Sequence, residues 1–290
     1  NSQSSEDINL LIAGVYVVTV TDVNNCSDSL TASINQPQFP ISLSSTSTSV
    51  LCFSQNNGSL NLTVTGGTSP YVYLWSNGST QEDIDSLLAG SFTVTVTDTK
   101  ACTSTLTSVV TQPTADLALS ATSTIVSCFN GTDGTIDLTT TGGTPPYQYY
   151  WSNTSSIVLS ATTEDLNLLP SDLYTVIVTD SNGCVQTLSV DVSQPLAALE
   201  IAFSGVNVSC HGGNNGAVSS SVTGGTLPYT YSWSNGQSTQ DISSLVHGTY
   251  VLTVTDSKNC SITESITINQ PTQSIDVSVV KQDVLCFGDS

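Results

Sequence analysis

Alternating apolar and polar positions along most of the chain predict β-strands rather than helices. In the clearest stretch, residues 91–98, Phe92, Val94 and Val96 alternate with threonines and a serine. A period of two places one kind of side chain on each face of a half-buried strand. No window of a dozen residues shows the 3.6-residue period of an amphipathic helix. We therefore expect an all-β protein with essentially no α-helix.

A second kind of strand carries the pattern Tyr-x-Tyr-x-Trp after a Gly-Gly turn and a proline. The pattern occurs three times, in residues 66–78, 142–153 and 224–236. Because the positions between the aromatic rings are largely polar in the later copies, we predict that the rings face the core. An exposed platform on which sugars stack is the alternative. The predicted core residues are Tyr71, Tyr73, Trp75, Tyr147, Tyr149, Trp151, Tyr229, Tyr231 and Trp233.

The three copies make the chain a tandem repeat, and a Gln-Pro pair closes each unit. The middle unit is longer, with its extra residues between Trp151 and Leu166, in a loop that we expect at the surface. Short strands with turn signals about every 8–12 residues predict small immunoglobulin-like β-sandwich modules of six or seven strands. The predicted modules are 38–113, 114–195 and 196–271, with partial modules at 1–37 and 272–290.

Composition and charge argue against two classes of function, nucleic-acid binding and membrane spanning. The chain has 3 Lys and Arg against 23 Asp and Glu, a net charge of −20, and only 9% charged residues. Clustered basic residues that would bind phosphates are missing, so we expect no nucleic-acid partner. No apolar stretch approaches the about 20 residues that span a bilayer, so we expect no membrane span in this fragment. Since Asn1 corresponds to Asn77, in the middle of a repeat, we expect the sequence to be part of a longer protein.

Eight cysteines occupy two fixed places in the repeat, and no Cys-x-x-Cys pair is present. Zinc is therefore disfavoured, and disulfides in an oxidising compartment are the better interpretation, which implies secretion. For so small a core, a disulfide worth about 2–4 kcal/mol matters.

The pairing of these cysteines has more than one solution. We favour a bridge within each module, which holds if an even number of strands separates the two cysteines, so that both lie at one end. If the number is odd, pairing between neighbouring modules, or from Cys102 to Cys128 along the junction, is the alternative. The favoured pairs are Cys52 with Cys102, Cys128 with Cys184 and Cys210 with Cys260, while Cys26 and Cys286 take partners outside the fragment.

The repeat resembles a known family. Its Gly-Gly-Thr-x-Pro-Tyr-x-Tyr-x-Trp-Ser-Asn run, the strand ending in Val-Thr-Val-Thr-Asp, the cysteine and the closing Gln-Pro are together similar to the SprB repeat. That repeat occurs in very large surface adhesins of gliding Bacteroidetes bacteria. The resemblance implies an extracellular filament at the outer membrane, exported by type IX secretion and active in gliding and surface attachment. Its implied partners are the gliding or secretion machinery and surface polysaccharide.

The sequence departs from this family pattern at two corners. Phe92 stands where a tyrosine is usual, and residues 170–173 replace the usual Ala-Gly corner. Both departures concern the local geometry of the corner and leave the resemblance intact.

The titratable residues form no pattern of an active site. His211 stands where other copies have phenylalanine, and His247 stands where others have alanine. Catalysis would then have to exist in one module and be absent from its siblings. We therefore expect no enzyme and no cofactor, calcium excepted.

An aspartate recurs directly after the Val-Thr strand, at Asp98, Asp180 and Asp256. It is either a turn residue that accepts backbone N–H bonds or a calcium ligand at a module junction. No Asp-x-Asp-x-Asp-Gly loop accompanies it. Separately, Asp-Ser-Leu triplets at Ser29 and Ser86 resemble the O-glycosylation signal of the same bacterial group.

Two functions are consistent with these features. The modules are either spacers in the stalk of an adhesin, each about 30–40 Å long, or an array of weak glycan- or polymer-binding sites that act through avidity. The loop at 54–58 is polar and varies between copies, which favours the stalk.

Overall fold

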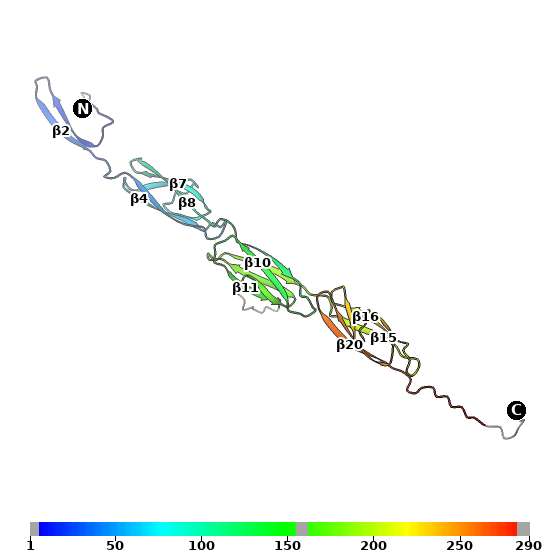
Figure 1. Cartoon of the computed structure of the whole chain (residues 1–290). Helices are drawn as coiled ribbons and strands as arrows, with labels where there is room; N and C mark the ends of the chain where they lie inside the picture. The colour runs from blue at the N-terminus through cyan, green and yellow to red at the C-terminus, as the bar shows by residue number, and fades with distance from the viewer. Residues whose placement is uncertain (1–5, 155–161, 283–290) are drawn as a thin grey trace, which may run out of the picture. The chain divides into compact units, whose positions relative to one another are not determined.

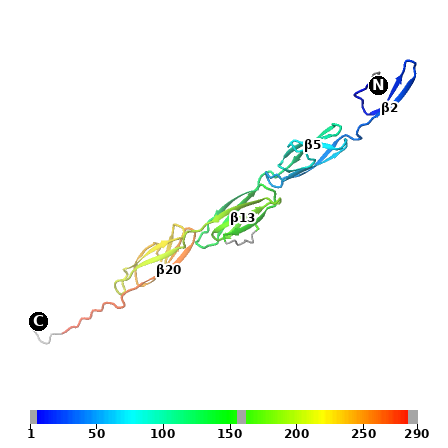
Figure 2. The same cartoon turned by 180° about the vertical axis from the view of Figure 1, so that it is seen from behind.

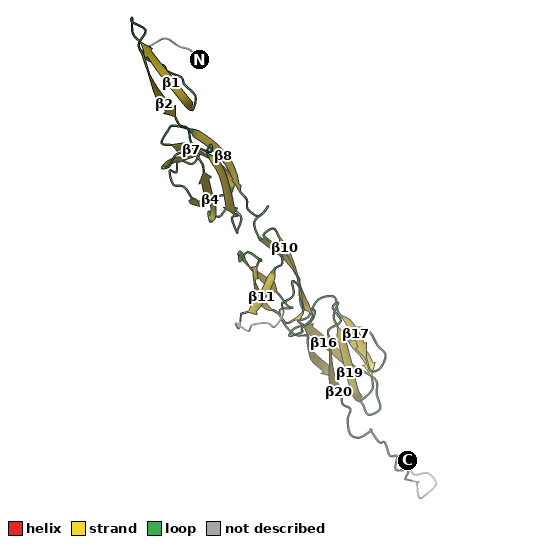
Figure 3. Cartoon of the chain, turned by 90° about the vertical axis from the view of Figure 1, so that its left-hand side faces the viewer, coloured by secondary structure: helices red, strands yellow, loops and turns green. Residues whose placement is uncertain are grey.

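A computed structural model describes residues 6–154 and 162–282. These residues form strands and turns, with no helix among them (Figure 3). Accordingly, the described part of the chain has no helix suited to crossing a membrane. The contacts divide the chain into two compact units. One holds the residues up to Leu117 with Gly142–Pro146 and Asp180–Cys184, and the other holds the remainder.

The strands form three sandwiches of the same design, each with two three-stranded antiparallel sheets (Figure 1 and Figure 2). In the first sandwich the sheet orders are β3-β4-β6 and β5-β7-β8. Its strands are β3 (Ser42–Thr48), β4 (Gly58–Thr65), β5 (Tyr71–Trp75), β6 (Ile84–Leu87), β7 (Gly90–Asp98) and β8 (Thr103–Val110).

The second and third sandwiches repeat this order of strands, and a separate hairpin precedes the first. The second contains β9 (Ala118–Thr124), β10 (Gly134–Thr141), β11 (Gln148–Asn153), β12 (Leu166–Leu169), β13 (Asp172–Thr179) and β14 (Val185–Val192). The third contains β15 (Glu200–Val206), β16 (Gly216–Thr223), β17 (Thr230–Trp233), β18 (Ile242–Leu245), β19 (Gly248–Thr255) and β20 (Ser261–Ile268). The hairpin is β1 (Gly14–Thr21) with β2 (Ser27–Ile34).

The predicted fold class is therefore confirmed: the protein is a tandem array of six-stranded immunoglobulin-like sandwiches. The module boundaries at 37, 113, 195 and 271 stay a prediction. The surface loop expected between Trp151 and Leu166 falls largely outside the described residues.

Each sandwich has its own hydrophobic core between the two sheets. In the first, Leu60 from β4 meets Trp75 from β5 and Val94 from β7, and all three are almost fully buried. The alternation seen in the sequence places Val94 and Val96 inside. At about 25 cal/mol per Å² of apolar surface, such large side chains supply much of the stability of each small core.

The corner before β7 differs between the sandwiches at one hydrogen bond. Tyr174 donates its hydroxyl to the carbonyl of Pro170, and Tyr250 does the same to Val246. Phe92 has no hydroxyl, so the first sandwich makes this corner without that bond. The substituted corner at Pro170 keeps the same strand arrangement as its counterparts.

The direction of the strands decides which loops share an end of the sandwich. A Cβ on Gly58, the first residue of β4, would lie 2.5 Å from Val110, and Gly90, the first residue of β7, pairs with Val110. Strands β4 and β7 therefore start at the same end and run the same way. Since β6 is antiparallel to β4 and β5 to β7, the consecutive strands β5 and β6 also run in the same direction.

Candidate functional site

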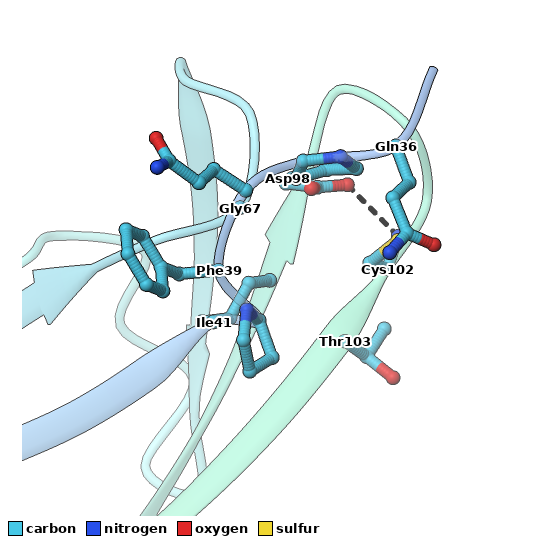
Figure 4. A pocket seen from close by; sticks show the side chains of 10 residues that line it. Gln36, Phe39, Ile41, Gly67, Asp98, Cys102 and Thr103 are labelled. Atoms are coloured by element: carbon cyan, nitrogen blue, oxygen red, sulfur yellow. Dashed lines mark hydrogen bonds between the residues drawn. The ribbon is translucent and has the colours of Figure 1, made fainter. Parts of the chain in front are cut away.

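A buried aspartate organises the turn at one end of each sandwich. Asp98 is 5% exposed, and its Oδ1 accepts hydrogen bonds from the amides of Lys100 and Cys102, both at 2.9 Å. Its Oδ2 accepts a third from the amide of Thr68 at 3.0 Å. Figure 4 shows the carboxylate directed at Cys102. We call residues 98–102 and their counterparts 180–184 and 256–260 the aspartate turns.

The other two aspartates make the same three bonds. Asp180 accepts from the amides of Asn182, Cys184 and Thr144 at 2.8 to 2.9 Å. Asp256 accepts from Lys258, Cys260 and Thr226 at the same range of distances. The repeated aspartate is thus a turn residue that ties the Gly-Gly loop to the β7–β8 turn.

The Gly-Gly sequence is required by this close approach. Gly67 has a φ of +64°, and a Cβ there would lie 3.1 Å from Oδ2 of Asp98 and 2.6 Å from Ile41. A side chain would meet both a left-handed backbone and the carboxylate. The glycine therefore leaves room for the amide-to-carboxylate bond of Thr68.

The carboxylate oxygens of the aspartate turns face amide hydrogens, whereas a calcium ion needs free oxygen ligands. Within residues 6–154 and 162–282, no group of three or more His, Cys, Asp or Glu side chains could hold a metal ion. The geometry favours the turn interpretation over a calcium site at Asp98, Asp180 and Asp256.

The hydrogen bonds at Asp98 give the first sandwich a defined response to acid. Burial acts to raise the pKa of this carboxyl, but the amides of Cys102, Thr68 and Lys100 outweigh it, so the pKa lies below its ordinary value. A lowered folded-state pKa stabilises the fold above the unfolded pKa of about 3.9, and this contribution is lost as pH falls through the folded pKa.

Replacing Asp98 by asparagine should remove that acid response. The Asp98→Asn variant should lose stability at pH 7, because an amide hydrogen of the introduced side chain would face a backbone donor. Its stability should then change less than that of the wild type between pH 5 and 2. The free energy of unfolding of the first sandwich measures both effects. It is obtained from urea titrations in which amide hydrogen exchange in β7 is monitored. Asp85→Asn, at an exposed position in the same sandwich, is the control. Equal acid sensitivity of Asp98→Asn and the wild type would contradict the assignment.

The disulfides join loops of different sandwiches. Cys52 pairs with Cys184 and Cys128 with Cys260, with Cα–Cα distances of 5.7 and 5.6 Å. The two cysteines of each bond are 132 residues apart in the sequence. The first lies in the loop before β4 or β10, and the second lies in the aspartate turn of the following sandwich. Asn182 adds a hydrogen bond from its side-chain amide to the carbonyl of Leu51 at 2.9 Å.

The favoured pairing within each module is therefore wrong. Cys52 does not pair with Cys102, nor Cys128 with Cys184, nor Cys210 with Cys260; Cys26, Cys102 and Cys210 are free and exposed. The physical reason is the direction of β5 and β6. The even number of strands between Cys52 and Cys102 would return the chain to the same end only if every strand reversed it. Because β5 and β6 run the same way, Cys52 and Cys102 lie at opposite ends of the sandwich.

Polar side chains that the sequence analysis overlooked hold the loop that carries the first cysteine. Asn57 accepts the amide of Leu51 at 3.1 Å, and Gln112 accepts the amide of Ser54 at 3.0 Å. The counterparts are Asp133, Gln194, Asn215 and Gln270. Gln112, Gln194 and Gln270 precede the closing prolines, so their recurrence was a usable signal.

The aromatic residues of the Tyr-x-Tyr-x-Trp strands divide into two groups. The tryptophans are buried and donate Nε1–H to backbone carbonyls, while the tyrosines are half-buried and pack against the cores. The tryptophans are Trp75, Trp151 and Trp233, and the tyrosines are Tyr71, Tyr73, Tyr147, Tyr149, Tyr229 and Tyr231. Tyr71 and Tyr229 also donate their hydroxyls to the Gly-Gly loop. The buried indoles are therefore not available for stacking against a sugar.

The remaining candidates lie apart from this site. Ser29 on β2 and Ser86 on β6 are exposed. Ser29 hydrogen-bonds Thr19, and Ser86 donates to Asp85. His211 and His247 are exposed, one in a cysteine loop and one at the corner before β19.

Each of the three sandwiches contains one match to the same protein-family model. The family model described as SprB repeat matches residues 44–80, 120–156 and 202–238, so the chain contains three SprB repeats. Each match begins in the first strand of a sandwich and ends just after the tryptophan strand. No enzyme family is found in the chain. None of the curated proteins matches it.

Several solved structures resemble this chain, all at low sequence identity. Eight N-terminal Ig domains of Down Syndrome Cell Adhesion Molecule are 10% identical, with 89% of this chain and 43% of that one covered at a TM-score of 0.39. A tetra-tandem repeat in the extending region of a large adhesion protein is 17% identical, with 92% and 84% covered at 0.26. A Ca²⁺-stabilised adhesin with which an Antarctic bacterium binds ice is 15% identical, with 88% and 80% covered at 0.33.

Proposed function

We propose that the chain is a segment of the stalk of a secreted bacterial adhesin at the cell surface. The observation that carries this proposal is the pair of disulfides between successive sandwiches, Cys52–Cys184 and Cys128–Cys260. A stalk must transmit tension, and a disulfide from one sandwich to the next adds a shorter covalent path that limits how far the chain extends if a sandwich unfolds. Disulfides also accord with an oxidising, extracellular location.

The SprB repeats support a more specific role in gliding motility and surface attachment, with export by type IX secretion. In this role the segment holds an adhesive part away from the outer membrane, and its partners include the gliding or secretion machinery and surface polysaccharide. The strongly acidic composition, with a net charge of −20, keeps such repeats soluble and mutually repelling.

An array of weak glycan- or polymer-binding modules is the second candidate. It is favoured by the repetition itself, because many weak sites gain avidity when linked. It would need the same exposed chemistry in every copy. The loops after the first cysteine instead carry different exposed residues at matching positions, such as Ser54, Asn130 and Gly212.

Two changes to the adhesin separate these candidates in the bacterium. Deleting residues 114–195 removes one whole sandwich and shortens the stalk, and we expect severalfold weaker surface attachment. Changing Asn56, Thr132 and Asn214 to alanine leaves the length unchanged, and we expect attachment close to that of the wild type. Attachment is counted as cells retained under flow, with the amount of surface protein measured in parallel. Equal loss in the alanine variant would overturn the stalk and favour the binding array.

A further inference from the structure

Polar side chains from two successive sandwiches meet at one loop residue in the first junction, where Cys52 pairs with Cys184. Leu51, the residue before Cys52, donates its amide to Oδ1 of Asn57 at 3.1 Å. Its carbonyl accepts a hydrogen bond at 2.9 Å from the side-chain amide of Asn182, in the aspartate turn of the next sandwich. The sulfur of Cys184 lies 3.6 Å from the same carbonyl oxygen. The loop and the turn are therefore held together by two polar side chains as well as by the disulfide.

The second junction repeats this geometry with a pair of opposite charges. Ser127, the residue before the paired cysteine, donates its amide to Oδ1 of Asp133 at 2.8 Å. Its carbonyl oxygen lies 3.3 Å from the sulfur of Cys260. Lys258 stands two residues before Cys260, which is the position that Asn182 holds at the first junction. A carboxylate has thus taken the place of one side-chain amide, and an ammonium group has taken the place of the other.

The two charges of the second junction act on each other. The hydroxyl and the amide of Ser127 lower the pKa of the Asp133 carboxyl below its ordinary value, and the Lys258 ammonium acts in the same direction. Both charged side chains are exposed, so their attraction is that of a surface ion pair, a factor of about two to five in an equilibrium constant. Salt screens it, because the Debye length falls from about 30 Å at 0.01 M to about 3 Å at 1 M. Asn57 and Asn182, at the same positions of the first junction, carry no charge.

We propose that Asp133 and Lys258 are positioning residues that draw the cysteine loop of the second sandwich onto the aspartate turn of the third and so favour the Cys128–Cys260 bond. Their attraction raises the effective concentration of one thiol at the other. The bond itself forms by exchange with a small-molecule disulfide such as oxidised glutathione. The two thiols lose two electrons and two protons, and the oxidant leaves as two molecules of its thiol. The inference rests on the geometry of the two junctions and does not depend on the adhesin role.

The test compares the two junctions within one molecule. It uses the full chain with the four cysteines outside these bonds replaced, as Cys26→Ser, Cys102→Ser, Cys210→Ser and Cys286→Ser. After equilibration in a glutathione buffer and alkylation of the remaining thiols, mass spectrometry gives the oxidised fraction of each junction, and hence an equilibrium constant for each bond. Because both constants come from one molecule, screening of its net charge of −20 affects both of them.

We expect the ratio of the Cys128–Cys260 constant to the Cys52–Cys184 constant to fall about two- to fivefold when sodium chloride is raised from about 0.01 M to about 1 M. The first junction supplies the reference, since its pair is uncharged. A ratio that stays constant or rises with salt would overturn the proposal.

Asparagine variants copy the first junction and separate the charge from the fold of the loop. Asp133→Asn keeps an acceptor for the Ser127 amide, as Asn57 is at the first junction. Asp133→Asn and Lys258→Asn should each lower the ratio at low salt about two- to fivefold and abolish its dependence on salt. The double variant should be no lower than either single variant, because the two residues act as one pair. Lys100→Asn, the same substitution in the aspartate turn of the first sandwich, should leave the ratio unchanged. Losses that add in the double variant, or an equal loss in Lys100→Asn, would show that no such pair exists.

Discussion

Pulled by its two ends, the oxidised chain should extend to only about half the length of the reduced chain. The shortest covalent path follows residues 1–52, crosses to Cys184, runs back to Cys128 and crosses to Cys260 before it reaches residue 290. At about 3.6 Å per residue, this path reaches about 500 Å, against about 1,000 Å for the reduced chain. Single-molecule force extension, with free thiols alkylated beforehand, measures both limits.

Single and double variants make this expectation sharper, because the two disulfides are not independent. Cys52→Ser alone leaves Cys128–Cys260 in place, and the limit should rise only to about 570 Å. Cys128→Ser alone should give the same limit. The double variant should reach about 1,000 Å. Cys102→Ser and Cys210→Ser are matched controls without effect, and a longer limit in either of them would contradict the disulfide pattern.

Removing the tryptophan from one core should unfold that sandwich. Trp151 has no exposed surface, and its Nε1 donates to the carbonyl of Thr163 at 3.1 Å. Truncating a buried tryptophan to alanine costs about 3–5 kcal/mol, and a domain of this size has little more than about 5 kcal/mol to lose. Trp151→Ala should therefore leave β9–β14 largely unprotected in amide hydrogen exchange.

The neighbouring residue on the same strand provides the control. Tyr150 points to the opposite face of β11 and is 49% exposed. Tyr150→Ala should change the stability by no more than about 0.5 kcal/mol, as surface substitutions usually do. Trp75 and Trp233 remain in both variants, so their fluorescence reports whether the first and third sandwiches stay folded. Equal losses of protection in the two variants would mean that the aromatic strand is not the centre of the core.

Much of the fold could be predicted because alternation reports directly on which face of a strand is buried. Val94 and Val96 alternate with threonines, and both are fully buried. The position of Trp75, two residues beyond Tyr73 on the same face, likewise indicated the core. The recurrence of Asp98 directly after a strand indicated a turn, and the three amide bonds supply its reason.

The disulfide pattern could not be predicted in the same way, because alternation contains no information about strand direction. Residues 76–83 carry the chain from β5 in one sheet to β6 in the other without reversing it. A turn of ordinary polar composition gives no sign of this. The disulfide partner of Cys52 is therefore Cys184, which is 132 residues away in the sequence and belongs to the next sandwich.

The overlap of the two disulfides has a consequence for breakage of the backbone. The interval from Cys52 to Cys184 and the interval from Cys128 to Cys260 share residues 128–184. Any one peptide bond between Cys52 and Cys260 is thus bypassed by at least one sulfur bridge. A protease that nicks an exposed loop in this region would leave both halves of the molecule attached, and a second cut would be needed to shed the distal part.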